Sequence, residues 1–467
     1  MKRYFYYVLA VMLLVLCCNA FADPLENANW RIKQYRTREV KLKLRDFQGR
    51  KLKDVKVKIQ MQRHQFLFGC SIFSFGAFKT EEENQGYLEL FSGLFNYATV
   101  PFYFRAAERK GGAREAERNE EIIKWCEANH ITMKGHTLIW HEPAGNPSWL
   151  SDDPSEVERA LRKRVETVIR EYRYEISIWD LLNEPTVAWR KDTPVAKWEN
   201  KIGPVKAWER ALKWAKGVDR SGVYLVNDFN IDASSALAGF ISDPERIWKM
   251  AEDPVKHYPV SYKNYIEALK REGAKPDAIG IQAHMHKGNW PLWEVWQLCE
   301  TYSRLNIPIH FTETTVLSGE PKDKIYWHEP EKNLPWPSTE KGEREQADYV
   351  EKYYKLLFSH PAVEAITWWN LSDYDAWLNA PAGLVRRDLS KKPAYERLER
   401  LIKKEWWTSL EEKTDDDGEI EFRGFCGDYQ IILPEQGNYS TFSIDCDKKD
   451  GQKIEVRVQR KFKQVQE

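Results

Sequence analysis

The sequence predicts an α/β protein built around a (β/α)8 TIM barrel, with a short N-terminal β segment and a small C-terminal all-β module. Short apolar strands and helical stretches alternate eight times over roughly 330 residues, which fits such a barrel with insertions. The strands are continuous apolar runs, as expected where helices cover the outer face of a parallel sheet. At 467 residues the chain is longer than most single cores, so appendages to one large domain are expected.

The barrel is expected to occupy residues 65–404. Its strands are predicted at 66–72, 97–104, 132–140, 176–183, 223–228, 278–284, 308–313 and 365–370, and its helices at 81–95, 115–130, 154–173, 205–220, 261–272, 291–305, 343–359 and 394–404. Before the barrel, residues 39–62 alternate between apolar and polar positions around a turn at 46–49. This pattern predicts a hairpin in an N-terminal β segment at 23–64.

After the barrel, an acidic, glycine-ended turn at 413–418 is followed by alternating residues at 419–459. This pattern predicts a β module at 405–467. Either terminal β segment could bind sugar, but support of the barrel is the simpler interpretation.

The first 22 residues are typical of a secretory signal peptide. Lys2 and Arg3 precede an apolar run at 4–18, and Ala20 and Ala22 form a small-residue cleavage pattern, so cleavage is predicted after Ala22. The apolar run is short for a membrane span, and no other stretch is apolar enough for one. A secreted or periplasmic protein is therefore expected. Lipoprotein anchoring through Cys17 or Cys18 is the alternative, but Leu16 stands where a small residue normally precedes the modified cysteine.

The overall charge gives no indication of a charged partner, and the composition is rich in tryptophan. Lys plus Arg and Asp plus Glu both total 71, so the net charge of zero offers no argument for nucleic acid or an anionic membrane as partner. The 20 Trp residues are a marked excess. Aromatic rings stack on the apolar faces of sugars, although a large core would also use them.

Five cysteines remain after the leader, an odd number that leaves at least one thiol without an intramolecular partner. Cys426 and Cys446 lie in one short segment and could pair. Cys70, Cys126 and Cys299 stand in apolar patterns typical of small buried residues. None of the cysteines has metal-ligand spacing.

Polar and aromatic residues gather at the predicted carboxyl ends of the strands, where barrels place their chemistry. Glu184 ends the fourth strand and Glu313 the seventh, on opposite sides of the barrel mouth. Two carboxyl groups facing each other across a cleft are what glycoside hydrolysis needs, since one protonates the leaving oxygen and the other attacks or activates water. The other strand ends supply His136, Trp140, His141, Asn183, Asn227, Asp228, Gln282, His284, His286, Trp368 and Trp369.

The same residues argue against other kinds of site. A metal site would need more of the imidazole and carboxylate groups to converge, whereas tryptophans and amides favour a polyhydroxy ligand. The sequence contains no glycine-rich phosphate loop after a strand and no G-x-S-x-G elbow. We therefore expect no metal and no cofactor.

At these positions the chain resembles glycoside hydrolase family 10, the retaining endo-xylanases. The resemblance spans roughly residues 65–404 and lies in seven motifs that occur in order, each in its own βα unit. The motifs are Lys-Gly-His-Thr-Leu-Ile-Trp-His at 134–141, Trp-Asp-x-x-Asn-Glu at 179–184, Val-Asn-Asp-Phe-Asn at 226–230, Gly-Ile-Gln-Ala-His at 280–284, Phe-Thr-Glu at 311–313, Thr-x-Trp-x-x-x-Asp-x-x-x-Trp at 367–377 and Lys-Pro-Ala-Tyr at 392–395.

The resemblance implies a role for each motif residue. Glu184 is the acid/base, protonated in the free enzyme, and Glu313 is the ionised nucleophile. Asn183 binds the 2-hydroxyl of the cleaved sugar. The remaining substrate-binding residues implied are His136, Trp140, Gln282, His284, Trp369 and Trp377. The implied outcome is retention of configuration on xylan or a related β-1,4-linked plant polysaccharide, which requires carboxyl groups about 5 to 5.5 Å apart.

Two departures leave the substrate open. After strand two the family usually has an acidic residue and Asn followed by Lys, whereas residues 95–105 here read Phe-Asn-Tyr-Ala-Thr-Val-Pro-Phe-Tyr-Phe-Arg. Pro185 directly follows Glu184, as in related barrel families. The alternatives are a related barrel glycosidase with a different β-glycan or exo specificity, and a catalytically silent barrel that binds glycan. The sequence does not indicate the oligomeric state.

Overall fold

The computed structural model describes residues 23–107, 112–229, 231, 261–434 and 438–458. The expected leader at 1–22 and Asn230 lie outside the described residues. In the part of the chain that is described, no helix is both long and apolar enough to cross a membrane.

Eight parallel strands form a closed barrel, as the sequence predicted. Each strand pairs with the next along the chain, and closure comes from the pairing of the last strand with the first. The strands are β3 (Leu67–Ser71), β4 (Tyr97–Pro101), β5 (Thr132–Trp140), β6 (Ile178–Asn183), β7 (Val223–Asp228), β8 (Ala278–Ile281), β10 (Ile309–Val316) and β11 (Val363–Trp368). A two-residue strand, β9 (His284–Met285), extends the pairing of β10 at its carboxyl end.

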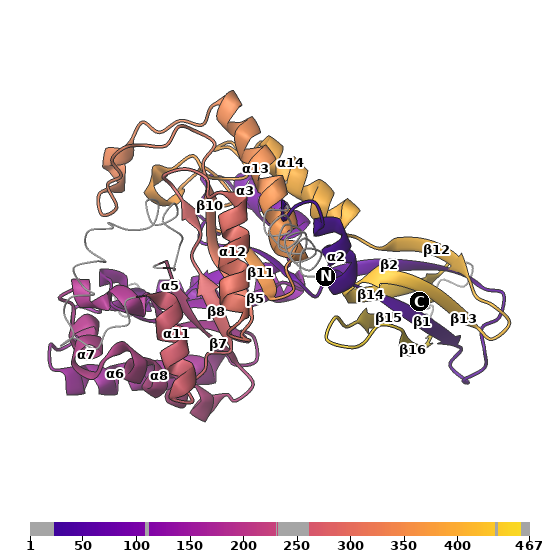
Figure 1. The fold of residues 1–467 in the computed structure, drawn as a ribbon, viewed down its shortest axis with the longest axis horizontal. Helices are drawn as coiled ribbons and strands as arrows, with labels where there is room; N and C mark the ends of the chain where they lie inside the picture. The colour runs from indigo at the N-terminus through magenta and orange to yellow at the C-terminus, as the bar shows by residue number, and fades with distance from the viewer. Residues whose placement is uncertain (1–22, 108–111, 230, 232–260, 435–437, 459–467) are drawn as a thin grey trace, which may run out of the picture.

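A helix follows every barrel strand and covers its outer face (Figure 1). These helices are α3 (Glu81–Leu94), α5 (Gly112–Ala128), α6 (Pro154–Tyr172), α8 (Pro204–Val218), α11 (Tyr262–Arg271), α12 (Leu292–Ser303), α13 (Glu340–Ser359) and α14 (Pro393–Arg400). Their starts follow capping rules: Thr80 forms a capping box with Glu83, and the side chains of Asp153 and Ser261 accept bonds from the first turns of α6 and α11. The sequence patterns missed α2 (Ala28–Arg36) and α7 (Pro194–Ile202).

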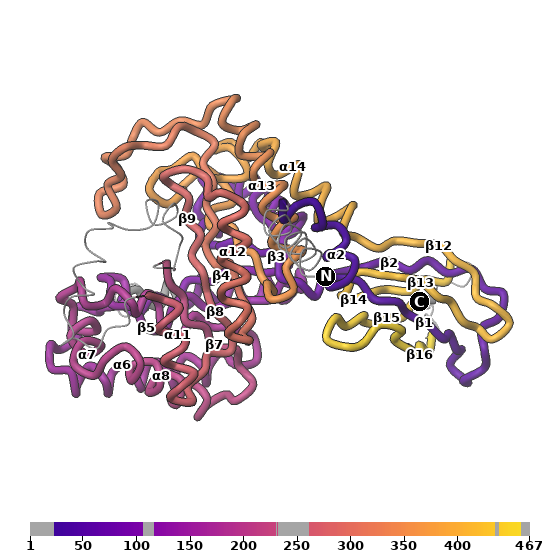
Figure 2. Tube along the Cα trace, viewed as in Figure 1, coloured from indigo at the N-terminus to yellow at the C-terminus, as the bar shows by residue number. Residues whose placement is uncertain are grey.

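The two terminal β segments form one two-sheet module. One sheet has the order β13-β1-β16 and the other β12-β2-β14-β15. Figure 2 shows the indigo N-terminal strands among the yellow C-terminal ones. The strands are β1 (Thr37–Arg45), β2 (Lys56–His64), β12 (Ser409–Lys413), β13 (Glu419–Phe425), β14 (Gly427–Leu433), β15 (Asn438–Ile444) and β16 (Gln452–Arg457).

The predicted hairpin at 39–62 forms only beside its turn, where Arg45 and Lys51 make an isolated antiparallel bridge; the further pairing that it implied between β1 and β2 is wrong. The turn at Asp46–Gly49 forms, but β1 pairs with β13 and β16, whereas β2 pairs with β12 and β14 in the other sheet. The physical reason is burial: the apolar faces of β1 and β2 contribute to one core between the two sheets. Each strand then takes its hydrogen-bond partners from the C-terminal segment.

The module is attached at the end of the barrel where the strands begin (Figure 1). There β2 runs directly into β3, and the π-helical turn after α14, Leu401–Glu405, leads into β12. The buried guanidinium of Arg36 donates hydrogen bonds to the carbonyls of Phe358, His360 and Val363 at 2.6–2.7 Å. The module therefore lies at the opposite end of the barrel from the carboxyl ends of the strands.

The cysteines behave as expected. Cys426 and Cys446 form a disulfide within the module, and Cys70, Cys126 and Cys299 are buried free thiols.

Candidate active site

Strand register brings the predicted site residues to one level of the barrel. Trp140 on β5 is the register partner of Asn183 on β6, and Asn183 is the partner of Asn227 on β7. Asn227 in turn pairs with Gly280 on β8, two residues before Gln282. Because the strands are parallel, their last residues meet at the same rim, which is the end remote from the β module.

Glu184 stands immediately after β6 in a left-handed conformation, φ 58° and ψ 37°. This region is uncommon for a residue with a side chain, so the surroundings must hold it. The Glu184 amide donates to the carbonyl of Asn227 at 2.7 Å, and Pro185 starts a 3-10 turn, Pro185–Arg190. Asp228 fixes that turn, since its Oδ2 accepts bonds from the amide and hydroxyl of Thr186 at 3.1 and 2.8 Å.

The Glu184 carboxyl is set up to hold a proton near neutral pH. Its two oxygens accept hydrogen bonds from Trp140 Nε1 and Gln282 Nε2, both at 3.0 Å. Burial raises the pKa of Glu184 to about 7, and the charge of Glu313 adds to the rise, although His141 and the two hydrogen bonds oppose it. A carboxyl with this pKa suits a general acid.

Glu313, within β10, has the opposite electrostatic environment. Its Oε1 accepts from Asn227 Nδ2 at 2.7 Å, and its Oε2 lies 2.9 Å from His284 Nε2. Burial alone would raise the pKa of Glu313, but the hydrogen bond from His284 and the positive fields of His136, His284 and Lys134 outweigh it. The pKa of Glu313 therefore lies below its usual value, which keeps this carboxylate charged.

Asn227 connects the two acidic strand ends, a role that the sequence patterns did not assign. Its Nδ2 donates to both Asn183 Oδ1, at 2.8 Å, and Glu313 Oε1. Its own Oδ1 accepts from Thr312 Oγ1 at 2.6 Å. The hydroxyl of Thr315 lies 2.9 Å from His284 Nδ1 and fixes that ring. In the sequence, Asn227 stood out as a strand-end and motif residue and Thr312 only as a member of the 311–313 motif, and nothing there marked Thr315.

His136 belongs to a buried charged group beneath the site. Its Nδ1 lies 2.8 Å from Asp180 Oδ2, and Lys134 Nζ lies 2.6 Å from the same oxygen. All three side chains are buried. Burial would raise the pKa of Asp180, but Lys134 and His136 outweigh it and hold that pKa below its usual value. The group orients the His136 ring toward the rim.

Aromatic rings enclose the two carboxyls. The Trp369 ring lies edge-on to both His136 and His284, with centroids 5.6 Å apart in each case, and Trp377 lies 4.6 Å from His284. Eight of the nine residues predicted for the site are thus linked by hydrogen bonds or ring contacts, and the ninth, Asn183, is linked to Glu313 through Asn227. Where the sequence departs from the family, Tyr103 packs against Trp140 and His136 at 5.8 and 5.6 Å.

One group near the site has metal-ligand spacing. His141, Glu142 and Glu184 offer ligand atoms within 4.8 Å of one another. Two of these side chains already have partners, since Glu142 forms an ion pair with Lys191 and Glu184 is bonded as described above. His141 Nδ1 lies 3.6 Å from the buried Glu199, and neither ring nitrogen of His141 makes a hydrogen bond among the described residues. The hydrogen bonds at Glu184 fit an acid better than a metal ligand.

Comparison with known proteins identifies the family. The model of glycosyl hydrolase family 10 matches residues 75–400, more than half of the chain. The chain belongs to glycosyl hydrolase family 10. It has the barrel fold of that family.

Among proteins similar to this chain, endo-1,4-beta-xylanase 1 of Arabidopsis thaliana is 22% identical over 90% of this chain and 39% of its own length. The anti-sigma-I factor RsgI6 of Acetivibrio thermocellus is 24% identical over 89% of this chain and 48% of its own length. The chain thus spans less than half of either relative. Xylanase 10B from Thermotoga petrophila, solved in complex with xylobiose, shares the fold with a TM-score of 0.54 and 22% identity, covering 73% of this chain and 95% of the other.

Proposed function

We propose that this family 10 member is a secreted, retaining, endo-acting hydrolase of β-1,4-xylan or a related plant cell-wall polysaccharide. The observation behind the mechanism is the opposed environment of two carboxyls at one rim. The pKa of Glu184 is raised to about 7, whereas that of Glu313 is lowered. An acid and an anion facing one bond are the pair that double displacement uses.

In the proposed reaction, Glu313 attacks the anomeric carbon as Glu184 gives its proton to the departing glycosidic oxygen. The C–O bond breaks and a covalent glycosyl–Glu313 ester forms. Glu184, now ionised, takes a proton from water, whose oxygen attacks the same carbon and displaces Glu313. Both residues return to their starting protonation states, and two inversions leave the configuration retained.

The other predicted residues have supporting roles. Trp140 and Gln282 hold the Glu184 carboxyl, and His284 and Asn227 hold that of Glu313. Asn183, fixed by Asn227, is proposed to bind the 2-hydroxyl of the cleaved sugar. The rings of His136, Trp369 and Trp377 would line its subsite. Xylan is chosen because relatives and fold neighbours are named as endo-1,4-beta-xylanases or xylanases.

Residues 65–404 are proposed as the catalytic barrel, and the segments 23–64 and 405–467 as its support. The module lies at the far end of the barrel from the two carboxyls, and Arg36 bonds to three barrel carbonyls there. Export depends on the leader at 1–22.

The decisive experiment is Glu313→Gln, assayed beside wild type on xylan, arabinoxylan and mixed-linkage glucan. Hydrolysis should fall by at least about 10³-fold because the nucleophile is lost while the fold persists. Glu364→Gln, at an exposed carboxyl on β11, is the matched control and should keep full activity. Undiminished hydrolysis by Glu313→Gln would reject the assignment. A ladder of oligomers indicates endo cutting, and the anomer formed first, read by proton NMR, decides retention.

Two other functions would give distinct results. Release of single sugars, or cutting of another β-glycan in preference to xylan, would favour the related glycosidase. The observation that favours this related glycosidase is that Tyr103 packs against His136 and Trp140 in a region where the family has polar residues. Glycan affinity without cleavage by wild type would favour a silent binding barrel.

A further inference from the structure

Aromatic rings lead outward from Glu313 to the surface. His284, bonded to Glu313, lies 4.6 Å from the Trp377 ring, and Trp377 lies 5.8 Å from the Trp327 ring. Exposure rises along this path: Glu313 is buried, Trp377 is 38% exposed and Trp327 is 45% exposed. Trp327 comes from the long loop between β10 and α13 and has no role in the reaction described above.

The side of the Trp327 and Trp377 rings that faces the protein interior is covered by other aromatic rings. The buried ring of His286 lies 5.2 Å from Trp377, 5.8 Å from Trp327 and 6.4 Å from Trp336. Neither nitrogen of His286 has a hydrogen-bond partner among the described residues, and burial lowers its pKa well below the usual value. His286 therefore packs as an uncharged ring behind the two tryptophans.

The loops that bear Trp327 and Trp377 pack as one unit. Asn333 Nδ2 donates to the carbonyl of Leu378 at 3.1 Å, and Asn379 Nδ2 donates to that of Pro330 at 3.0 Å. A small separate core joins the same two loops. Its members are Leu317, Ile325, Trp336, Leu378, Ala380 and Ala382.

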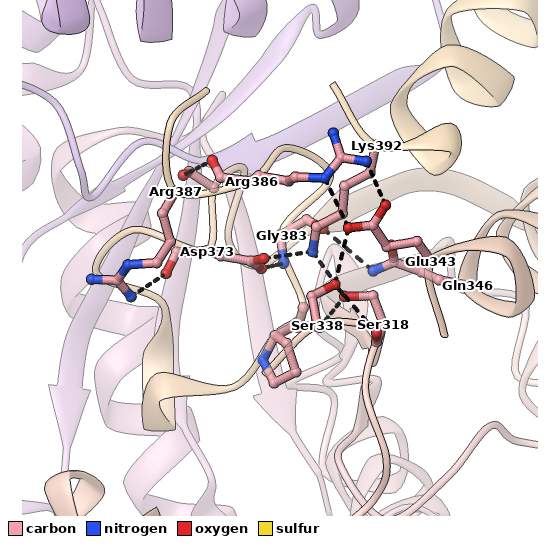
Figure 3. Close-up of polar contacts among 12 residues, drawn as sticks. Ser318, Ser338, Glu343, Gln346, Asp373, Gly383, Arg386, Arg387 and Lys392 are labelled. Atoms are coloured by element: carbon pink, nitrogen blue, oxygen red, sulfur yellow. Dashed lines mark hydrogen bonds and ion pairs between the residues drawn. The ribbon is translucent and has the colours of Figure 1, made fainter. Parts of the chain in front are cut away.

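A polar network around the buried Lys392 anchors both loops at their base (Figure 3). Lys392 Nζ lies 2.7 Å from Asp373 Oδ2 and donates to Ser318 Oγ at 2.8 Å. Asp373 Oδ1 accepts from the amide of Gly383 at 2.7 Å. Arg386 binds both oxygens of Glu343 on α13, at 3.0 and 2.6 Å. The exposed rings are therefore held in place before any ligand arrives, which lowers the entropy cost of binding.

From these contacts we infer that Trp327, with Trp377, forms a stacking platform for a sugar unit beyond the one at the cleavage site. The inference rests on the proposed function, because the occupant is the next pyranose of the same β-1,4-linked chain. Such sugars present flat C–H faces, which suit exposed indole rings. Because Trp377 contacts both His284 and Trp327, a polysaccharide bound at the cleavage site can extend outward over these rings. Trp327 is thus a specificity-determining residue that selects for longer substrates.

The test compares Trp327→Ala with wild type on β-1,4-xylo-oligosaccharides of two to six units. The loss in kcat/KM should grow with chain length and reach about tenfold on the longest, which corresponds to about 1.4 kcal/mol. KM should carry most of the change. Trp30→Ala is the matched control, because Trp30 is also an exposed indole but lies on α2. The next residue, Arg31, bonds Ser359 at the end of α13, which places α2 away from the two carboxyls. Trp30→Ala should leave kcat/KM unchanged at every length.

Binding measured in the Glu313→Gln background separates the platform from the proposed function. Calorimetry with xylohexaose should show about tenfold weaker binding when Trp327→Ala is added, and Trp327→Phe should recover part of the loss. The platform is refuted, while the proposed function stands, if wild type cleaves oligosaccharides and the kcat/KM of Trp327→Ala is either unchanged or lowered by the same factor at every chain length. If wild type cleaves nothing, the proposed function fails, and the same calorimetry decides whether the platform binds sugar.

Discussion

Replacement of Glu184 by glutamine should remove a pH-dependent loss of stability that wild type shows between acidic and alkaline pH, and should also remove its activity. The folded-state pKa of Glu184 is about 7, against an ordinary value of 4.5. The folded protein therefore binds this proton more tightly than the unfolded chain does. Wild-type stability should fall as pH rises from 4.5 to about 7 and stay lowered above that, because the buried carboxylate must then be charged. The amide side chain of the variant cannot ionise and lacks this term.

The magnitude follows from the pKa difference. Between 4.5 and about 7, at 1.36 kcal/mol per pKa unit, the pH-dependent term amounts to about 3 kcal/mol. In the variant, the NH2 group of the new glutamine must face one of the two donors, Trp140 Nε1 or Gln282 Nε2, that bond the carboxyl in wild type. Two facing donors leave a hydrogen bond unmade, at a cost of about 1 to 3 kcal/mol. That cost offsets the gain at high pH but varies little with pH. The change in the variant-minus-wild-type difference between pH 4 and pH 8 is therefore the quantity to test.

The assay is denaturant unfolding of both proteins at pH 4, 6 and 8, followed by tryptophan fluorescence. The free energy of unfolding of Glu184→Gln, relative to wild type, should rise by about 3 kcal/mol across this series. Glu364→Gln serves as control, because its exposed carboxyl should give no such trend. A difference that is constant with pH would refute the reasoning, since Glu184 would then ionise alike in both states.

Three further predictions concern the same residues and the loop anchor. The alkaline limb of the kcat/KM pH profile should lie near pH 7, where Glu184 loses its proton. Gln282→Leu should move this limb to higher pH, because it removes a hydrogen bond that stabilises the Glu184 carboxylate. A limb that stays in place in the variant would contradict this. Thr315→Val should lower kcat about tenfold through looser placement of His284, with KM measured in parallel to separate binding from positioning. Lys392→Met should cost about 3 to 5 kcal/mol of unfolding free energy because Asp373 stays buried without its cation, and Lys391→Met, at an exposed ion pair, about 1 kcal/mol at most. Equal losses in the two lysine variants would show that burial of the Lys392 pair is unimportant.

The repeating pattern of the sequence determined the barrel and most of its rim. Apolar strand runs such as that ending at Asn183, alternating with helical stretches, are typical of a helix-covered parallel sheet whose strands are buried on both faces. Residues at strand ends must then meet at one rim, so Glu184 and Glu313, on the fourth and seventh strands, were predictable as carboxyls that face each other across the barrel mouth. The disulfide between Cys426 and Cys446 was foreseeable for a similar reason, because the two lie close in sequence.

What the sequence could not determine were contacts between distant segments. Residues 39–62 have a hairpin pattern, yet β1 and β2 pair along most of their length with C-terminal strands that are distant in sequence, because alternation shows which face is buried and not which strand lies alongside.

The same holds for the site. Asn227, Thr312 and Thr315 are ordinary polar residues until the fold places them against Asn183, Glu313 and His284. The opposed pKa values of the two carboxyls and the outward position of Trp327 are likewise properties of tertiary structure. They depend on burial and on neighbours from several strands and loops, which local sequence does not encode.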